Sequence, residues 1–280
     1  MTASNATSAV RIGVVGGNGQ MGQWLRRFWR DLGYEVMFSD CDTQESNEDV
    51  VSWADVTFVA VPLQVTPAVI RSLAPAMADT KALVSIASLM GPSASELIEL
   101  RGEAICAHPV FGPTVRRTAG LPVVVAGVRG DFWRGWLVAA LSEAGLEVRE
   151  TTPEEHDASM AVVQAMLHST YVALCGAMTS AGLPPLEALD WASPTLRLQL
   201  GLIARILGQD PELYADLVVG NTHAPALLDA LANELKHLAD LAREGDRAGF
   251  ATAFRTARDG FGDRGDDLAS RAEAALEQFT

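Results

Sequence analysis

The first half of the chain alternates short apolar, β-branched runs with longer stretches whose apolar residues recur at helical spacing. The short runs predict strands and the longer stretches predict helices, the first of them over residues 20–32. Six strands are predicted, at residues 11–15, 34–39, 56–61, 82–86, 104–107 and 122–126. Because strands and helices alternate, we expect an α/β fold with a mostly parallel sheet covered by helices.

The second half of the chain has a different pattern. From Pro153 onward, long segments with helical periodicity, such as 158–181 and 225–243, show hardly any β-branched alternation. Breaks that contain Gly and Pro, typical of helix ends, lie at 182–185, 208–211 and 260–265. We predict two domains, an α/β domain at 9–152 and an all-helical domain at 153–280, because 280 residues exceed the usual size of a single core.

Composition and charge narrow the class of partners. With 49% hydrophobic and 20% charged residues, the chain resembles ordinary globular proteins. The formal net charge of −14 argues against binding to nucleic acid or to an anionic membrane surface. A small anionic substrate would therefore need local Arg or His side chains in its binding site.

The chain shows no sign of export or of a membrane span. Residues 1–10 are small and polar, without the cationic start and apolar run of a secretory signal. No uninterrupted run of about eighteen apolar residues predicts a span. Three separated cysteines, Cys41, Cys106 and Cys175, predict neither a disulfide framework nor a thiolate metal cluster, so we expect a cytoplasmic protein.

A glycine-rich turn joins the first predicted strand to the first predicted helix. It contains a G-x-G-x-x-G pattern, Gly17-Asn18-Gly19-Gln20-Met21-Gly22, and Asp40 follows the next strand about twenty residues later. Gly17 would permit the sharp turn, Gly19 would let a pyrophosphate approach the backbone, and Gly22 would allow close helix–strand packing. Asp40 would accept hydrogen bonds from a ribose and repel a 2′-phosphate, so this Rossmann-like domain should prefer NAD to NADP. Asp42 adds to that repulsion or is a solvated loop residue.

His108 is the candidate catalytic residue of the same domain. It follows a predicted buried strand and precedes Pro109, which favours an extended backbone and so aims the imidazole outward from the strand end. Strand ends line the ligand crevice of open α/β sheets, and an imidazole there can take a proton near neutral pH. A His-Pro pair alone is more often structural, but together with the glycine turn it predicts hydride transfer assisted by a general base.

Four segments resemble the prephenate dehydrogenase family, in particular its enterobacterial branch, and the resemblance covers residues 11–270. The segments are VVGGNGQMG, HPVFGP, EEHDASMAVVQAMLH and SPTLRLQLGLIAR. The resemblance implies a homodimeric, NAD-dependent enzyme that oxidises a prephenate-type ring while the ring carboxylate leaves as carbon dioxide. The product would be a 4-substituted phenylpyruvate.

The resemblance also implies roles for residues of the first domain and of the segment that follows it. His108 would be the base that accepts a proton from the C4 substituent of the ring. Ser88 would lie near that substituent, although a serine at a strand end also caps helices. His156 would have a capping or structural role.

Three residues of the helical domain would bind substrate, and this domain would complete the active site. His168 would lie near the ring or would be a hydrogen-bonded core histidine. Arg197 and Arg205 lie eight positions apart, near one face of a helix, and would clamp the two carboxylates, with Arg205 on the side-chain carboxylate. Without the resemblance, such arginines are usually surface groups.

One departure from the family concerns Leu89-Met90-Gly91-Pro92, where enterobacterial relatives commonly carry Val-Lys-Asn-Gly-Pro. The lysine missing at the Met90 position would weaken attraction to prephenate. Its absence would relieve repulsion of a substrate with an ammonium in place of the ring hydroxyl. The family includes enzymes that act on 4-amino-4-deoxyprephenate. We therefore expect prephenate or its 4-amino analogue as the substrate.

Two other functions stay open on the sequence. A catalytically silent NAD-binding member, recruited as a sensor or scaffold, is disfavoured because His108, Ser88 and both arginines are retained. A related NAD-linked dehydrogenase acting on another small acid, such as a 3-hydroxy acid, would rely on a helix lysine, and residues 158–181 contain none. We expect no metal, because the histidines are not at ligand spacing with carboxylates or cysteines.

Overall fold

The computed structural model describes residues 10–277, so the polar residues 1–9 and the last three residues lie outside the described part. Its internal contacts divide the chain into two compact units, the first ending at Met160 and the second beginning at Ala161. The domain boundary predicted from the sequence, between residues 152 and 153, falls at the start of helix α6 (Pro153–Met160), the last element of the first unit.

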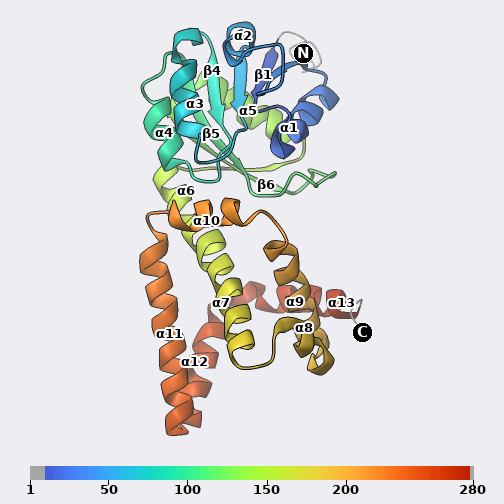
Figure 1. Cartoon of the computed structure of the whole chain (residues 1–280), viewed down its shortest axis with the longest axis vertical. Helices are drawn as coiled ribbons and strands as arrows, with labels where there is room; N and C mark the ends of the chain where they lie inside the picture. The colour runs from blue at the N-terminus through green and yellow to red at the C-terminus, as the bar shows by residue number, and fades with distance from the viewer. Residues whose placement is uncertain (1–9, 278–280) are drawn as a thin grey trace. The chain divides into compact units, whose positions relative to one another are not determined.

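A seven-stranded sheet forms the centre of the first unit (Figure 1). Its strands are β1 (Arg11–Val15), β2 (Glu35–Ser39), β3 (Val56–Val59), β4 (Ala82–Ser85), β5 (Glu103–Pro109), β6 (Pro122–Arg129) and β7 (Glu147–Glu150). The spatial order is β2-β1-β3-β4-β5-β6-β7, and neighbouring strands are parallel except for the antiparallel pair of β5 and β6. The predicted α/β fold with a mostly parallel sheet is confirmed.

Strands β5, β6 and β7 differ most from the pattern that the sequence predicts, and β6 continues to Arg129, three residues past its predicted end. Strand β7 is not predicted, because three of its four residues are charged; it lies at the edge of the sheet, where charged side chains reach water. Strand β5 continues two residues past the predicted end at Ala107, because antiparallel pairing with β6 carries the ladder on through Pro109. This extension places His108 inside the sheet.

Helices cover both faces of the sheet, since successive strand side chains point to opposite sides. The helices of this unit, besides α6, are α1 (Gln20–Asp31), α2 (Asn47–Trp53), α3 (Thr66–Leu73), α4 (Gly91–Leu97) and α5 (Phe132–Glu143). Helices α1 and α5 pack over one apolar cluster, which contains Trp29, Phe58 and Leu137. Helices α2, α3 and α4 pack over the opposite cluster, which contains Leu83 and Leu97.

Strands β1 to β5 are parallel, so the chain segments that follow their carboxyl ends lie along the same side of the sheet. The glycine turn follows β1, Asp40 follows β2, and the segment with Ser88 follows β4. His108 lies at the end of β5. The glycine turn and His108 are separated by three strand spacings, about 14 Å at the usual ~4.8 Å per strand. The sequence-predicted cofactor and proton-acceptor residues therefore share one edge of the first unit.

The second unit is helical throughout its described part. It consists of the π-helical segment η4 (Ala161–Met166), α7 (Leu167–Ser180), α8 (Pro185–Ala188), α9 (Pro194–Leu207), α10 (Pro211–Val219), α11 (Ala224–Glu244), α12 (Arg247–Asp259) and α13 (Gly265–Leu276). The η4 segment packs against α10 and α11, and α7 contacts α8, α9 and α10; α11 is the long orange helix in Figure 1. The all-helical organisation predicted for this half is confirmed.

One long helix in the described chain leaves many apolar side chains without cover. Residues Pro153–Ser180 form 28 continuous helical residues; the most apolar 18-residue stretch of this helix has a mean hydropathy of 1.3, and 17% of that stretch is buried. This helix is long and apolar enough to cross a bilayer, but one helix of this kind is weak evidence for a membrane span. Its exposed apolar residues include Val162, Val163, Leu167, Val172 and Leu174.

Candidate functional site

The glycine turn is shaped by close contacts that exclude larger residues. Gly16 has a φ of +82°, and the N–H groups of Gly16 and Gly17 both donate to the carbonyl of Ser39 at 2.9 Å. A Cβ at Gly22 would overlap the carbonyl oxygen of Gly16, and one at Gly17 would overlap the ring of Phe38. The left-handed conformation of the turn thus belongs to Gly16, which the sequence motif omits, whereas Gly17 is required by the neighbouring ring.

The mouth of this turn fits a dinucleotide phosphate. Helix α1 begins at Gln20 after the N-cap Gly19, with no side-chain cap and no acidic residue in its first turn. Asn18, Gly19 and Gln20 are exposed, and a Cβ at Gly19 would approach Gly16 to 3.3 Å. Glycine therefore leaves the backbone open at the place where uncapped N–H groups favour an anion. The next residue, Met21, is half-buried.

The carboxylate of Asp40 lies beside the turn. Its Oδ2 accepts a hydrogen bond from the N–H of Asn18 at 2.8 Å, and its Oδ1 accepts one from the N–H of Cys41 at 2.8 Å. Asp42 accepts a hydrogen bond from the Asn18 side-chain amide at 2.7 Å, so it is tied to the turn and is not a free loop residue. Two carboxylates therefore flank the side of the turn where an adenosine ribose would bind.

Arg26 is a further residue of this region that the sequence pattern does not single out. Its Nη1 donates to the carbonyl of Gly17 at 3.0 Å and to Oδ1 of Asn18 at 3.2 Å, and its guanidinium lies 3.3 Å from the centre of the Phe38 ring. Burial, with a smaller contribution from Arg30, lowers the pKa of Arg26. Its position one helical turn after Gly22 is the signal that could have identified it.

His108 is buried within the sheet, not aimed outward from a strand end. It pairs with Val124 of β6, and only 3% of the residue is exposed. The alternation along β5 turns its side chain to the same face as Ala104 and Cys106. Burial is the main cause that lowers the pKa of His108 to about 3; the nearby His156 lowers it further and Asp157 partly offsets this. The imidazole of His108 is therefore neutral over the physiological pH range.

The HPVFGP segment is held in place after His108 by aromatic packing. The ring of Phe111 lies edge-on to Trp24 of α1, with ring centres 5.1 Å apart. The indole N–H of Trp24 donates to the carbonyl of Val115 at 3.3 Å. The segment is thus fixed to the helix that follows the glycine turn.

A buried chain of hydrogen bonds leads from His108 to a carboxylate. Nδ1 of His108 lies 3.0 Å from Nε2 of His156, and the two rings are nearly perpendicular. Nδ1 of His156 lies 2.7 Å from Oδ1 of Asp157. The sequence predicts a capping or structural role for His156; α6 places its fully buried ring against His108, a contact that the sequence does not predict.

Asp157 is also anchored to the segment that follows β4. Its two oxygens accept hydrogen bonds from the N–H groups of Met90 and Gly91, each at 2.8 Å. Burial acts to raise the pKa of Asp157, but hydrogen bonds from His156, Met90 and Gly91 outweigh burial and leave that pKa below its ordinary value. The group facing His156 is therefore a carboxylate.

Ser88 and Met90 have different environments. Ser88 is half-buried and follows β4, whose residue Ser85 pairs with Cys106 of β5, so Ser88 and His108 come after neighbouring positions of adjacent strands. Met90 is fully buried in the apolar cluster beneath α4. The Met90 side chain is therefore part of the core, and the effect of the missing lysine on substrate charge stays a prediction.

The second unit brings His168 together with a residue that sequence reasoning missed, Tyr214. Their rings are 4.6 Å apart, and both line a mostly apolar cavity of about 440 Å³ between α7 and α10. Nδ1 of His168 and Oε1 of Gln164, four residues earlier, are buried polar atoms with no hydrogen-bond partner in the described chain. Burial lowers the pKa of His168. Buried polar atoms usually have hydrogen-bond partners, so these two atoms are candidates for contacts with a ligand or water.

The two arginines of α9 differ in their surroundings, although both are exposed. Arg205 is near enough to Tyr214 to counteract electrostatically the rise in tyrosine pKa that burial causes. Arg197 donates from Nε to the carbonyl of Ala192 at 3.3 Å, and it lies about 12 Å farther along the helix. The structure therefore groups Arg205 with Tyr214 and His168, and it places Arg197 apart from them.

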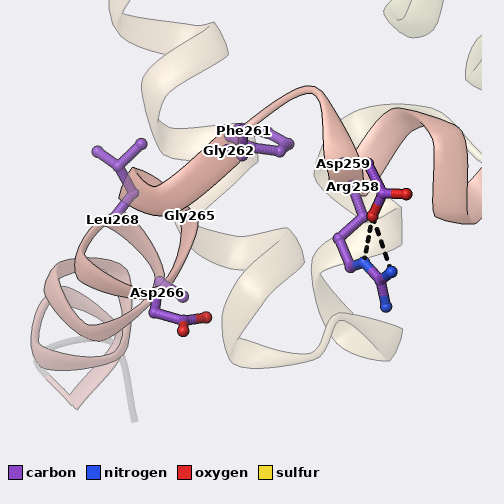
Figure 2. A pocket seen from close by; sticks show the side chains of 8 residues that line it. Arg258, Asp259, Phe261, Gly262, Gly265, Asp266 and Leu268 are labelled. Carbon is purple, nitrogen blue, oxygen red and sulfur yellow. Dashed lines mark hydrogen bonds and ion pairs between the residues drawn. The ribbon is translucent and has the colours of Figure 1, made fainter.

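A larger hollow of about 700 Å³ at the junction of α12 and α13 involves none of the predicted site residues. It is lined by Arg258, Asp259, Phe261, Gly262, Gly265, Asp266, Leu268 and Ala269. Figure 2 shows that Arg258 and Asp259, the adjacent charged residues, pair with each other there. Across residues 10–277, no group of three or more His, Cys, Asp or Glu side chains is arranged to hold a metal ion.

Two protein-family models match the chain. The model described as prephenate dehydrogenase, dimerization domain, matches residues 152–256. The model described as NADP oxidoreductase, coenzyme F420-dependent, matches residues 11–88, which include the glycine turn and Asp40.

Individual relatives cover nearly the whole chain. The 4-amino-4-deoxyprephenate dehydrogenase of Streptomyces pristinaespiralis is 30% identical over 278 residues, which cover 92% of this chain and 93% of that protein. The T-protein of Haemophilus influenzae is 28% identical over 269 residues, which cover 96% of this chain and 71% of that protein. The crystal structure of Synechocystis arogenate dehydrogenase has the same fold, with a TM-score of 0.73 and 19% identity over 91% of this chain and 99% of that one.

Proposed function

The chain belongs to the prephenate dehydrogenase family and is an NAD-dependent dehydrogenase, and we propose that it oxidatively decarboxylates prephenate or 4-amino-4-deoxyprephenate. The products would be the 4-substituted phenylpyruvate, carbon dioxide and NADH. The observation that carries the proposal is the buried, neutral His108 at the same sheet edge as a glycine turn open to a dinucleotide phosphate.

The cofactor site favours NAD, although the description of the family model for residues 11–88 names NADP. Asp40 would accept hydrogen bonds from the ribose, and its charge opposes a 2′-phosphate. Gly19 and the first turn of α1 would hold the pyrophosphate, and Asn18 would contact it from the exposed side. When bound, NAD accepts a hydride from C4 of the ring.

His108 supplies the proton transfer. As hydride leaves C4, His108 takes the proton from the C4 hydroxyl or amine. The electron pair of the bond between the ring and its carboxylate then enters the ring, and carbon dioxide departs. The C4 substituent of the aromatic product recovers the proton from His108, which returns to its neutral form. Ser88 would hydrogen-bond the same substituent.

Binding of the dianionic substrate falls to residues of the second unit. Arg205 would pair with the side-chain carboxylate, as guanidinium groups bind carboxylates bidentately. His168 and Tyr214 would add hydrogen bonds from the wall of the apolar cavity. Arg197 is the candidate for the second carboxylate, although it lies about 12 Å from Arg205 along α9 and apart from Tyr214 and His168.

The two substrates differ in the C4 substituent. The Streptomyces pristinaespiralis relative, which matches over almost its full length, is named for the amino compound, so that compound is our first candidate. NADH formation by the purified chain, measured with NAD and each substrate in turn, distinguishes between the two substrates. Turnover of either substrate supports the dehydrogenase proposal, and the preferred one identifies the C4 group. Binding of NAD with no turnover of either substrate would instead support the silent sensor or scaffold, or a dehydrogenase of another small acid.

We also propose that the chain is a cytoplasmic homodimer. The family model that matches residues 152–256 describes a dimerization domain, and the second unit exposes a large apolar surface. A second copy of the chain would cover the exposed apolar side chains of the Pro153–Ser180 helix without invoking a membrane. The three separated cysteines form no pair in the described residues, and the proposed compartment is a reducing one.

A further inference from the structure

We propose that Asp157, acting through His156, fixes the tautomer of His108 so that its Nε2 atom is the proton acceptor. Asp157 and His156 are thus a positioning pair. The inference rests on the proposed role of His108 as the base. All three side chains belong to the first unit, and their contacts are direct.

The positions of the hydrogens follow from the acceptor at the end of the chain. A carboxylate can only accept, so the hydrogen in its 2.7 Å contact with Nδ1 of His156 belongs to the histidine. In its neutral form the His156 ring carries one hydrogen, so its Nε2 then has a lone pair. The 3.0 Å contact then requires a hydrogen on Nδ1 of His108. Nε2 of His108 is left with a lone pair that can accept a proton.

The carboxylate itself is held rigidly. The N–H groups of Met90 and Gly91 bind its two oxygens at the start of α4, so it cannot rotate away from His156 without losing both bonds. The reversed arrangement of hydrogens would turn the lone pair of His156 Nδ1 toward the carboxylate, which is repulsive. One tautomer of His108 is therefore selected before substrate arrives.

The pair also compensates for the burial of His108. Protonation at Nε2 produces an imidazolium within an apolar setting, which is costly. The lone pair of His156 accepts its Nδ1–H, and the negative charge of Asp157 lies one ring beyond. An aspartate that orients an imidazole in the same manner in serine proteases contributes ~10⁴ in turnover. We expect a loss of ~10²- to 10⁴-fold in kcat for Asp157→Ala, with a small change in KM.

A direct readout is the tautomer of His108, measured by nitrogen-15 NMR on the full chain with labelled histidine at neutral pH and without ligand. The His108→Asn variant assigns its signals. We expect a hydrogen on Nδ1 and none on Nε2 in the unmodified chain, and a loss of this preference in Asp157→Ala. A hydrogen on Nε2 of His108 in the unmodified chain overturns the proposal, whether or not any variant folds.

Kinetics separate positioning from a structural role. If Asp157 acts through His108, Asp157→Ala should lower kcat in the unmodified chain but cost nothing further in a His108→Asn background. An equal loss in both backgrounds would show a structural effect and overturn the proposal. The matched control is Glu155→Ala, which removes a neighbouring exposed carboxylate bonded to Thr151, and should change neither kcat nor the tautomer.

The outcome is distinguishable from failure of the proposed function. Full turnover of His108→Asn would remove His108 as the base and so refute the proposed mechanism. The NMR result would still stand as a statement about the hydrogen positions in the free protein.

Discussion

The Oδ2 atom of Asp40 accepts a hydrogen bond from the N–H of Asn18 at 2.8 Å, across 22 positions of the chain. The bond ties the end of β2 to the centre of the glycine turn. The bond orients the carboxylate before any dinucleotide binds, so if Asp40 contacts the ribose as proposed, the choice between NAD and NADP depends on a preformed contact.

Replacement of Asp40 by Ala should reduce the preference for NAD over NADP by ~10-fold or more. A full charge opposing a phosphate at about 4 Å is worth about 1–4 kcal/mol, and 1.4 kcal/mol corresponds to a factor of ten. Dissociation constants for both cofactors, measured by calorimetry, test this expectation. Asp42→Ala is the matched control and should have the smaller effect; a larger effect at Asp42 would assign selectivity to that residue instead.

His108→Asn should lower kcat by ~10² or more while NAD affinity and KM change little, as expected for loss of a general base. Asparagine keeps a polar side chain of similar size in the sheet. Steady-state kinetics on prephenate and on its 4-amino analogue provide the measurement. Turnover within a few-fold of the unmodified chain would mean that another group takes the proton.

Arg205→Ala should weaken substrate binding by roughly 1.5–3 kcal/mol, or ~10- to 150-fold in KM, because it removes a charge-assisted hydrogen bond to a carboxylate. Arg197→Ala on the same helix should cost less, since Arg197 lies apart from Tyr214 and His168. If the two variants had reversed effects on KM, the side-chain carboxylate would belong to Arg197.

Acid should destabilise the first unit between about pH 6.5 and pH 3 through His108. The unfolded histidine takes up a proton near 6.5, whereas the folded one does so only near 3, so the unfolded state binds more protons in this window. Stability therefore falls as pH falls. Urea unfolding at several pH values should give a shallower dependence for His108→Asn than for the unmodified chain; equal slopes would show that His108 is not the cause.

Val163→Glu should shift the chain from dimer to monomer. Val163 is 50% exposed on the long apolar helix and lies outside the residues that line the cavity near His168. A charge at a buried interface costs far more than one in water. Sedimentation equilibrium over a range of concentrations checks the result. A monomeric unmodified chain, or a dimer unaffected by the substitution, would exclude this surface as the interface.

Local patterns predicted the strand, turn and helix around the glycine motif because these parts are close in sequence. The glycine turn, helix α1 and Asp40 follow from periodicity and spacing within about thirty residues. Even there, the positive φ of Gly16 and the lack of room for a Cβ at Gly17 beside Phe38 depend on contacts with strand β2 and escape the motif.

The surroundings of His108 could not be predicted in the same manner. His156 lies 48 positions away, and only the packing of α6 against the sheet brings their rings together. The end of β5 was misplaced because antiparallel pairing with β6 is a tertiary interaction. Tyr214 likewise carries no local signal, and its partnership with His168 arises from the packing of α10 on α7.

Strand β5 runs through His108 into Pro109, with a partner strand alongside it. The proposed base is fixed in a β ladder, so it cannot shift to contact a substrate ring of different shape. A residue on a surface loop could shift in that way. In the proposed mechanism, adaptation to a new C4 substituent would therefore fall to its other neighbour, Ser88, which lies outside the strand. The atom that receives the proton can stay the same while the family diversifies its substrates.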